Sequence, residues 1–176
     1  RIEHLMLPWL GKGDEAYAQL VELMEARGGT VHWMRSGGWI RSGKLLLTCL
    51  YNGDEKKKAD MNEHSLMLRL DYGQFEMIFT GDMSSEGEMD LLNIGICGSE
   101  NGETGKGGVI NRNKKFRILK VAHHGSKYST CEEFLLETNP RHAIISYKEG
   151  NSYGHPHKEV LERLEIQDIR IWKTAE

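Results

Sequence analysis

The stretch that decides the fold reads HSLMLRLDYGQFEMIFTGD, residues 64–82. Its first half alternates between two sets of side chains, as a β-strand does, because successive residues point to opposite faces of a sheet. One set is Leu66, Leu68, Leu70 and Tyr72, and the other is Met67, Arg69 and Asp71. Gly73 then turns the chain into a second strand, Phe75 to Thr80, which ends at Gly81 and Asp82. The stretch therefore predicts an antiparallel hairpin with a carboxylate directly after its second strand.

Further strands and helices are predicted on both sides of this hairpin. The strands are 2–8, 30–34, 44–51, 116–122, 142–147 and 169–172, and the helices are 14–27, 85–96, 129–138 and 156–164. Two of the helix starts are predicted from capping boxes, Ser85 with Glu88 and Ser129 with Glu132. Antiparallel hairpins followed by alternating strands and helices predict a mixed α/β layered fold (α+β) in a single domain over residues 1–176.

Composition limits what the chain can be. Its 176 residues are 39% hydrophobic and 28% charged, which excludes a disordered chain and suits one globular domain. No apolar run approaches the roughly 18 to 20 residues of a membrane span. The chain opens at Arg1 without a signal-peptide pattern, so we expect an excised piece. Its three cysteines are widely spaced, which predicts buried thiols rather than a disulfide framework.

The net charge of −3 gives no overall attraction to polyanions, but one segment is basic. Residues 104–131 contain no carboxylate, and their cationic side chains are Lys106, Arg112, Lys114, Lys115, Arg117, Lys120 and Lys127. A solvated loop is one interpretation. The segment runs directly into His123 and His124, which favours the other interpretation, a positive face for an anionic substrate.

Three short motifs follow predicted strands: TGD at 80–82, HHGS at 123–126 and GHPH at 154–157. Carboxylate oxygens and neutral imidazole nitrogens are ligands that Zn²⁺ or Mn²⁺ accepts, so these motifs predict a shared metal site. Adjacent strand residues point to opposite faces. We therefore expect only one of His123 and His124 to reach the site unless Gly125 bends the chain.

Each motif also has a structural alternative. Asp82 could cap the helix that follows it, and His155 could be an N-cap before Pro156. Ser126 and Ser129 could serve loop and cap hydrogen bonds. Single histidines are expected to be ordinary polar residues, but four of the eight lie in two loop motifs, which favours a site. The sequence has no P-loop, no GxSxG and no HExxH, so those chemistries are not indicated.

Four strings together resemble one family: NEHSLML at 62–68, FTGD at 79–82, LKVAHHGS at 119–126 and NSYGHP at 151–156. They are similar to the metallo-β-lactamase-like domain at the C-terminal end of the ComEC/Rec2 DNA-internalisation competence proteins. The likeness covers nearly the whole chain. It implies a metallo-β-lactamase-like αββα sandwich, N-terminally truncated here, with a metal-dependent phosphodiesterase (nuclease) site that degrades the DNA strand that is not transported.

By position, the resemblance implies that Asp82 is a carboxylate bridging two Zn²⁺ or Mn²⁺ ions and that His155 is a terminal metal ligand. His124, or else His123, would be a further ligand or a contact to the transition state. The implied substrate contacts are Ser126 and Lys120, with Asn62 as another site candidate. The implied partners are single-stranded DNA and a membrane-embedded remainder of the parent protein, with this domain outside the cytoplasm and no nucleotide cofactor.

One part of the family's pattern, HxHxDH, has no match, because the only HxH in the chain is His155 to His157. We therefore expect the 176-residue chain by itself to be inactive and to bind metal weakly or not at all. Two alternatives stay open. One is a free-standing hydrolase of a small phosphodiester or ester, and the other is a DNA-binding domain without catalysis.

Overall fold

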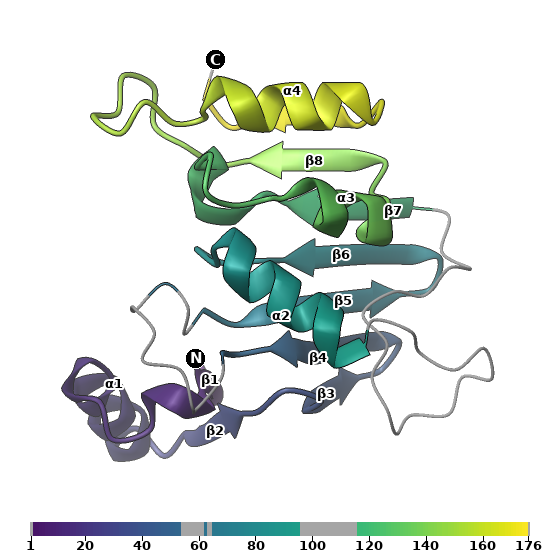
Figure 1. The fold of residues 1–176 in the computed structure, drawn as a ribbon. Coiled ribbons are helices and arrows are strands. Elements are labelled where there is room, and N and C mark those ends of the chain that lie inside the picture. Colours follow the sequence, from purple (N-terminus) through teal and green to yellow (C-terminus); the bar gives the residue numbers. More distant parts are fainter. Residues whose placement is uncertain (1, 54–61, 63–64, 96–115, 176) are drawn as a thin grey trace.

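The computed structural model of the chain describes residues 2–53, 62, 65–95 and 116–175. These residues form a two-stranded parallel sheet and a seven-stranded mixed sheet, with helices packed on them (Figure 1). The mixed α/β fold expected from the sequence is confirmed at this level. No helix among the described residues is both long enough and apolar enough to cross a membrane.

The small sheet pairs β1 (His4–Pro8) with β2 (Thr30–Met34) in parallel, and His4 lies opposite Thr30. The chain between them forms η1 (Trp9–Gly11) and α1 (Glu15–Ala26). Asp14 caps α1, because its carboxylate accepts the amide proton of Ala16 at 2.9 Å. These two strands and this helix confirm the sequence prediction.

The large sheet runs in the order β3 (Trp39–Ser42), β4 (Leu45–Tyr51), β5 (Met67–Tyr72), β6 (Phe75–Phe79), β7 (Phe116–Lys120), β8 (His142–Ile145) and β9 (Arg170–Lys173). Neighbours from β3 to β6 are antiparallel, and neighbours from β6 to β9 are parallel. The connections after β6, β7 and β8 therefore begin at the same edge of the sheet. Among the strands that the structure describes, β3, a four-residue strand between glycine turns, is the one that the sequence analysis does not predict.

The remaining helices are α2 (Ser85–Gly95), η3 (Ala122–Gly125), α3 (Glu132–Thr138) and α4 (Lys158–Ile166). Helices α2 and α3 lie across one face of the large sheet (Figure 1). The buried core beneath them joins sheet residues such as Ile78 and Leu119 to Phe134 of α3 and Leu164 of α4. This apolar core fixes the helices, and with them the loops at the carboxyl edge of the parallel strands.

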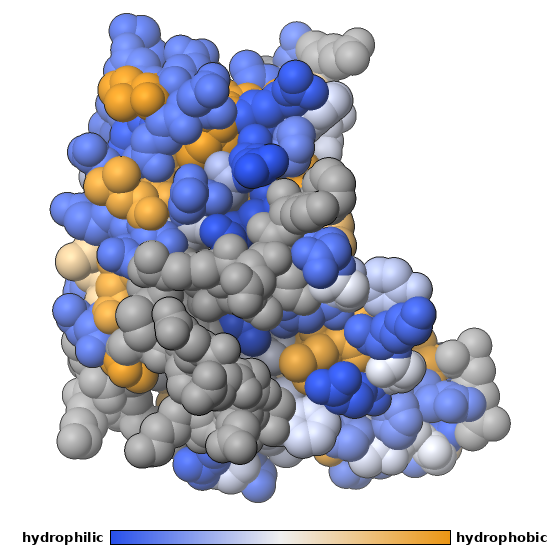
Figure 2. Space-filling model, turned by 90° about the vertical axis from the view of Figure 1, so that its right-hand side faces the viewer, coloured by the Kyte–Doolittle hydropathy of each residue, from blue (hydrophilic) through white to orange (hydrophobic). Residues whose placement is uncertain are grey.

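The opposite face of the sheet carries large apolar side chains that are only half-buried or exposed. They are Leu45, Leu47, Leu68, Leu70, Met77, Phe79, Ile118, Ile144, Tyr72 and Trp172. The alternation predicted for β5 is confirmed, but its leucine set faces this open side, whereas Met67 and Asp71 are buried. Figure 2 shows the molecule from the side with a stepped outline and apolar side chains in separate patches among hydrophilic ones.

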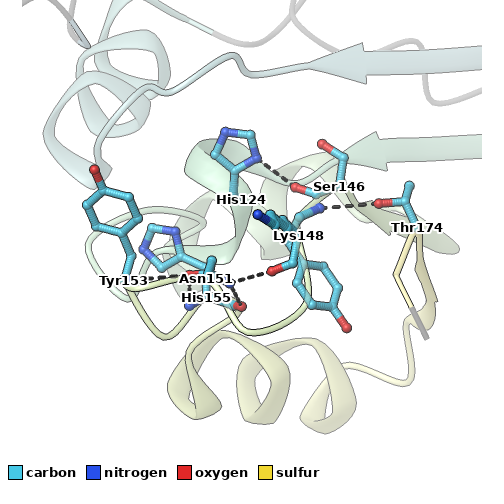
Figure 3. A pocket seen from close by; sticks show the side chains of 8 residues that line it. His124, Ser146, Lys148, Asn151, Tyr153, His155 and Thr174 are labelled. Carbon is cyan, nitrogen blue, oxygen red and sulfur yellow. Dashed lines mark hydrogen bonds between the residues drawn. The ribbon is translucent and has the colours of Figure 1, made fainter.

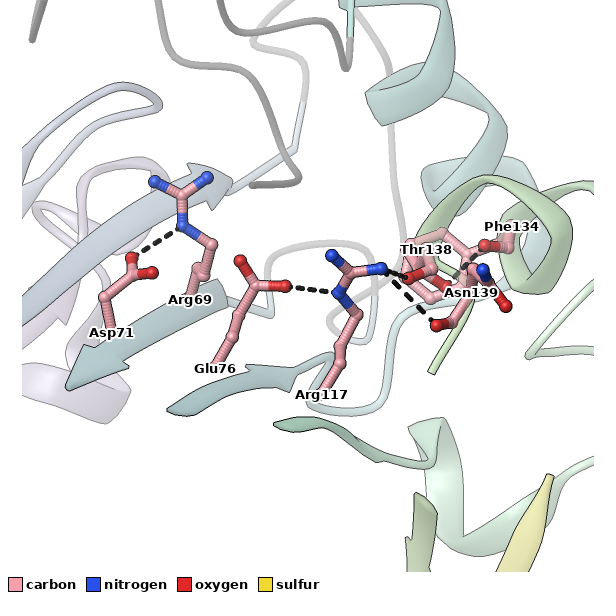
Figure 4. Close-up of polar contacts among 7 residues, drawn as sticks. All are labelled: Arg69, Asp71, Glu76, Arg117, Phe134, Thr138 and Asn139. Atoms are coloured by element: carbon pink, nitrogen blue, oxygen red, sulfur yellow. Dashed lines mark hydrogen bonds and ion pairs between the residues drawn. The ribbon is translucent and has the colours of Figure 1, made fainter. Parts of the chain in front are cut away.

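A buried ion pair lies on the helix-covered face (Figure 4). Arg117 Nε donates to Glu76 Oε1 at 2.6 Å, and Glu76 is fully buried. Arg117 Nη1 also donates to the carbonyls of Thr138 at 2.9 Å and Asn139 at 3.4 Å, which ties β7 to the end of α3. The expectation of a substrate-facing basic segment therefore fails at Arg117. Lys106, Arg112, Lys114 and Lys115 lie outside the described residues.

Neither predicted capping box forms. The hydroxyl of Ser84, not that of Ser85, accepts the amide protons of Glu86 and Gly87 at 3.1 and 3.4 Å. The Ser129 hydroxyl donates to the Ala122 and Ser126 carbonyls instead of capping α3. The N-cap of α3 is Cys131, whose side chain makes no capping hydrogen bond.

The cysteine prediction is confirmed for the two cysteines that the structure describes. Cys49 and Cys131 are free and buried, and burial raises the pKa of each thiol to about 12. Such thiols stay protonated and unreactive near neutral pH. Cys97 lies outside the described residues.

We predict that Glu76→Ala destabilises the protein by about 3 to 5 kcal/mol, because it removes the carboxylate that pairs with the buried Arg117 guanidinium. Urea unfolding measures this loss. The double variant Glu76→Leu with Arg117→Met should lose less than Glu76→Ala alone, because no charge is left buried. A single variant with wild-type stability would show that the pair contributes nothing.

Candidate functional site

Three loops meet at the carboxyl edge of β6, β7 and β8. They carry Asp82, the His123–His124 pair and His155 in that order. Two backbone hydrogen bonds join them: the His123 amide donates to the Gly81 carbonyl at 3.0 Å, and the His157 amide donates to the Gly125 carbonyl at 2.9 Å. The parallel pairing of the strands thus brings together residues up to 76 positions apart in the sequence (157 − 81).

A left-handed turn carries the two adjacent histidines. His123 has φ 44° and His124 has φ 55°, and Gly125 follows with φ 86°. Residues other than glycine rarely adopt this backbone conformation, because it costs roughly 1 to 3 kcal/mol for each of them. The bend thus begins at His123 rather than at Gly125, and both imidazoles reach the same edge. This backbone bend over His123, His124 and Gly125 is the condition under which the sequence analysis allows both rings to reach the site.

The geometry of His124 fixes which of its nitrogens is free. Its Nδ1 lies 2.6 Å from the carbonyl oxygen of Ser146, which can only accept a proton. In the neutral ring, Nδ1 therefore carries the proton and Nε2 keeps a lone pair. That Nε2 lies 3.9 Å from Oδ1 of Asp82, and both side chains are about half exposed. A metal-binding imidazole is oriented by a backbone carbonyl in this way.

His155 packs within a group of rings. Its ring centroid lies 5.6 Å from that of His123 and 4.8 Å from that of His157. Burial, followed by the neighbouring imidazoles, lowers the pKa of His155, and Asp82 partly opposes this shift. The ring therefore keeps the neutral form that can bind a metal ion over a wider pH range.

The backbone of His155 is clamped by Asn151, whose side chain accepts from the His155 amide at 3.0 Å and donates to its carbonyl at 2.6 Å. The N-cap of α4 is His157, so the alternative that His155 caps this helix is wrong. His157 Nδ1 accepts the amide proton of Lys127 at 3.2 Å. Nδ1 of His157 therefore holds the backbone of the loop after η3.

Asp82 is presented by a tight turn. Its amide donates to the Ser65 hydroxyl at 3.1 Å, and a Cβ at Gly81 would lie 2.8 Å from Ser65 Cβ. Since Ser84 caps α2, Asp82 does not have that role. The Lys120 ammonium, half-buried, donates to the Val121 carbonyl at 2.8 Å. Burial lowers the pKa of Lys120 and Asp82 raises it, so the two groups are electrostatic neighbours.

The two other predicted substrate contacts lie further back. Ser126 is buried, and its hydroxyl accepts from the Tyr128 amide at 3.4 Å. The Asn62 carbonyl accepts from the amide of Ser65, the residue whose hydroxyl holds the Asp82 amide. Of the supporting residues, Ser146 gave no signal in the sequence, and Ser65 stood inside the NEHSLML string without an assigned role. Asn151 stood inside the NSYGHP string without an assigned role.

The loop that carries the histidine pair is anchored by a buried carboxylate. Glu88 of α2 accepts the amide protons of Thr130 and Cys131, both at 2.8 Å, and so holds the two residues that directly precede α3. Burial raises the pKa of Glu88 to about 7, and the Arg163 charge nearby opposes this shift. The Arg163 guanidinium also donates to the Ser129 carbonyl at 3.0 Å.

Two donors converge in this site, Asp82 Oδ1 and His124 Nε2. Among the residues that the structure describes, no group of three or more His, Cys, Asp and Glu side chains is arranged to hold a metal ion. Structural and catalytic zinc sites use three or four protein ligands. The donor set therefore matches the chemistry of a metal site but supplies only part of one.

A cavity of about 380 Å³ lies beside the two donors (Figure 3). It is lined by His124, Ser146, Tyr147, Lys148, Asn151, Tyr153, His155 and Thr174. Figure 3 shows Tyr153 and His155 at one side of it and Ser146 and Thr174 at the other. The cavity thus opens next to the converging donors.

Comparison with known proteins finds relatives of this chain. No family model matches the sequence. The chain is 39% identical to ComE operon protein 3 of Bacillus subtilis over 66% of its length, 31% identical to competence protein ComA of Neisseria gonorrhoeae over 68%, and 32% identical to recombination protein 2 of Haemophilus influenzae over 67%. These matches cover only 13% to 15% of the relatives' lengths. They support a relationship to the ComEC/Rec2 competence family.

We predict that Gly125→Ala destabilises the protein more than Gly150→Ala does. Both glycines have positive φ (86° and 65°), which alone costs an alanine about 1 kcal/mol. A Cβ at Gly125 would also lie 2.6 Å from Pro156 Cβ, whereas nothing lies within 4 Å at Gly150. Urea unfolding should show at least about 1 kcal/mol of additional loss at Gly125. Equal losses would contradict the close packing described here.

We predict that Glu88 makes stability fall as pH rises. Its pKa is about 7 when folded and near 4.5 when unfolded, so the folded protein holds one proton more between these values. The contribution is complete below pH 4.5 and lost above pH 7, with a slope of up to about 1.4 kcal/mol per pH unit. Unfolding across this range should show that Glu88→Gln removes the slope. Glu86→Gln, an exposed neighbour, should keep it, and an unchanged slope in Glu88→Gln would refute the assignment.

Proposed function

We propose that this chain forms part of a metallo-β-lactamase-like domain that hydrolyses phosphodiesters with divalent metal ions while a competence protein takes up DNA. The observation that carries the proposal is the convergence of Asp82 and His124 at 3.9 Å, with the His124 ring oriented by the Ser146 carbonyl. An exposed carboxylate and a correctly oriented imidazole at the carboxyl edge of parallel strands are suited to cation chemistry.

Each side chain of the proposed metal site would have a role that follows from its chemistry. Asp82, with two oxygens, would hold two ions at once, while His124 and His155 would each give one neutral nitrogen. His123 packs on His155 and would position it or contact the phosphate. Lys120 would add positive charge beside Asp82, where a phosphate oxygen would lie. Divalent ions at such a site activate water and stabilise the charge that develops on a phosphodiester.

The open face of the large sheet supports the finer fold. In a sandwich, two sheets pack face to face through apolar side chains about 10 Å apart. The half-buried leucines on β4 and β5 are the kind of surface that a second sheet covers. A second layer could also bring the remaining metal ligands, such as an HxHxDH segment. The 176-residue chain alone is expected to lack activity for this reason.

The relatives support the choice of substrate. Two of them are named for competence or its operon and one for recombination, which favours DNA over a small ester. By resemblance, the substrate is single-stranded DNA, and the domain lies outside the cytoplasm on a membrane-embedded parent. A DNA-binding domain without catalysis is the main alternative, and the experiment below separates the two.

The test is hydrolysis of linear DNA by the complete protein that contains this chain, with Mn²⁺ or Zn²⁺ and with a chelator. We expect metal-dependent cleavage that Asp82→Asn and His155→Ala each lower by about 100-fold or more, since both remove a proposed ligand. The 176-residue chain alone should show no cleavage. Its metal content after dialysis should stay below one ion per chain.

Asp168→Asn is the matched control. Asp168 lies between α4 and β9 at the opposite end of the parallel strands, and asparagine tolerates its φ of 55°. The Asp168→Asn variant should cleave DNA as the wild type does. If DNA binding is strong and salt-sensitive but no cleavage occurs with either metal, and Asp82→Asn changes nothing, the domain only binds DNA and the proposal is wrong.

A further inference from the structure

The cavity beside the proposed metal site has one aromatic wall that is open to solvent. The Tyr153 side chain is 76% exposed, and its ring stacks on His155 with centroids 5.7 Å apart and planes 22° from parallel. The Tyr153 amide donates to the Asn151 side chain at 3.2 Å, which fixes the loop that presents the ring. One face of the tyrosine thus rests on a proposed metal ligand, and the ring remains largely accessible.

The other side of the cavity is held by the end of the chain. The Tyr147 amide donates to the Thr174 hydroxyl at 3.2 Å, and the Tyr147 hydroxyl donates to the Ala175 carbonyl at 3.0 Å. Lys148 follows directly and is exposed at the cavity. The opening therefore combines a fixed wall, an accessible aromatic ring and a cationic side chain within reach of His124.

We propose that the mouth of this cavity binds the nucleotide adjacent to the phosphodiester that is cleaved, with its base stacked on the free face of Tyr153 and a backbone phosphate near Lys148. The inference rests on the proposed function and specifies its substrate. A base can stack on a protein ring only when it is unpaired, so the subsite favours single-stranded DNA over duplex. The cavity volume of about 380 Å³ is at the lower end of the range of ligand pockets and suits one nucleotide.

The two groups make separate contributions. Stacking of one base on an aromatic ring is sequence-tolerant, because every base has a π-face. Its loss weakens binding by about fivefold to 150-fold. A lysine beside a phosphate contributes through charge, which is independent of the base and screened by salt.

The experiment measures binding of the complete protein to a fluorescent oligothymidylate and to an abasic strand of equal length, both in chelator. Binding in chelator does not depend on metal or cleavage, so this readout survives if the proposed phosphodiesterase activity fails. Tyr153→Leu should weaken oligothymidylate binding at least about fivefold and leave abasic binding unchanged. Tyr153→Phe should bind like the wild type, because the ring remains.

Two further variants sharpen the result. Tyr72→Leu, at the exposed end of β5 far from this edge, should not change binding of either strand. Lys148→Gln should weaken binding of both strands and reduce the salt dependence by about one phosphate contact. The subsite is refuted if Tyr153→Leu binds oligothymidylate as the wild type does, or if it weakens the abasic strand equally.

Discussion

The site depends on one close approach, that of Gly125 to Pro156. A left-handed turn follows β7, and its glycine lies so near the proline that a Cβ there would be 2.6 Å from the proline Cβ. The His157 amide donates to the Gly125 carbonyl at the same place. This contact sets the loop after β8 against the loop after β7. His155, next to Pro156 in the chain, lies beside His123 and lines the cavity.

Hydrogen bonds with backbone groups determine which ring nitrogens of the site's histidines are available. The Ser146 carbonyl accepts a hydrogen bond from Nδ1 of His124, so Nε2 of the same ring is directed to Asp82. The Lys127 amide instead occupies Nδ1 of His157. Burial and the neighbouring imidazoles lower the pKa of His155. The three histidines thus differ in which ring nitrogens are available because their surroundings differ.

The two faces of the large sheet have opposite characters. The face under the helices buries charge, with Glu76 and Arg117 paired between β6 and β7. The other face presents leucines that no described helix covers. Charged pairs are tolerated where every group has a partner, as Arg117 has in the carbonyls of α3. An apolar face left open is instead a surface that favours contact with another layer.

The sequence by itself determined the β5–β6 hairpin, most of the other strands and helices, and the placement of three reactive motifs at strand ends. These features follow from local alternation and turn residues. The tertiary structure decided that Glu88 holds the amides of Thr130 and Cys131 before α3, and that His123 and His124 reach one edge. Glu88 and Thr130 are 42 residues apart, so no local pattern could reveal their contact. Which face of β5 is buried was likewise decided by the packing of distant helices.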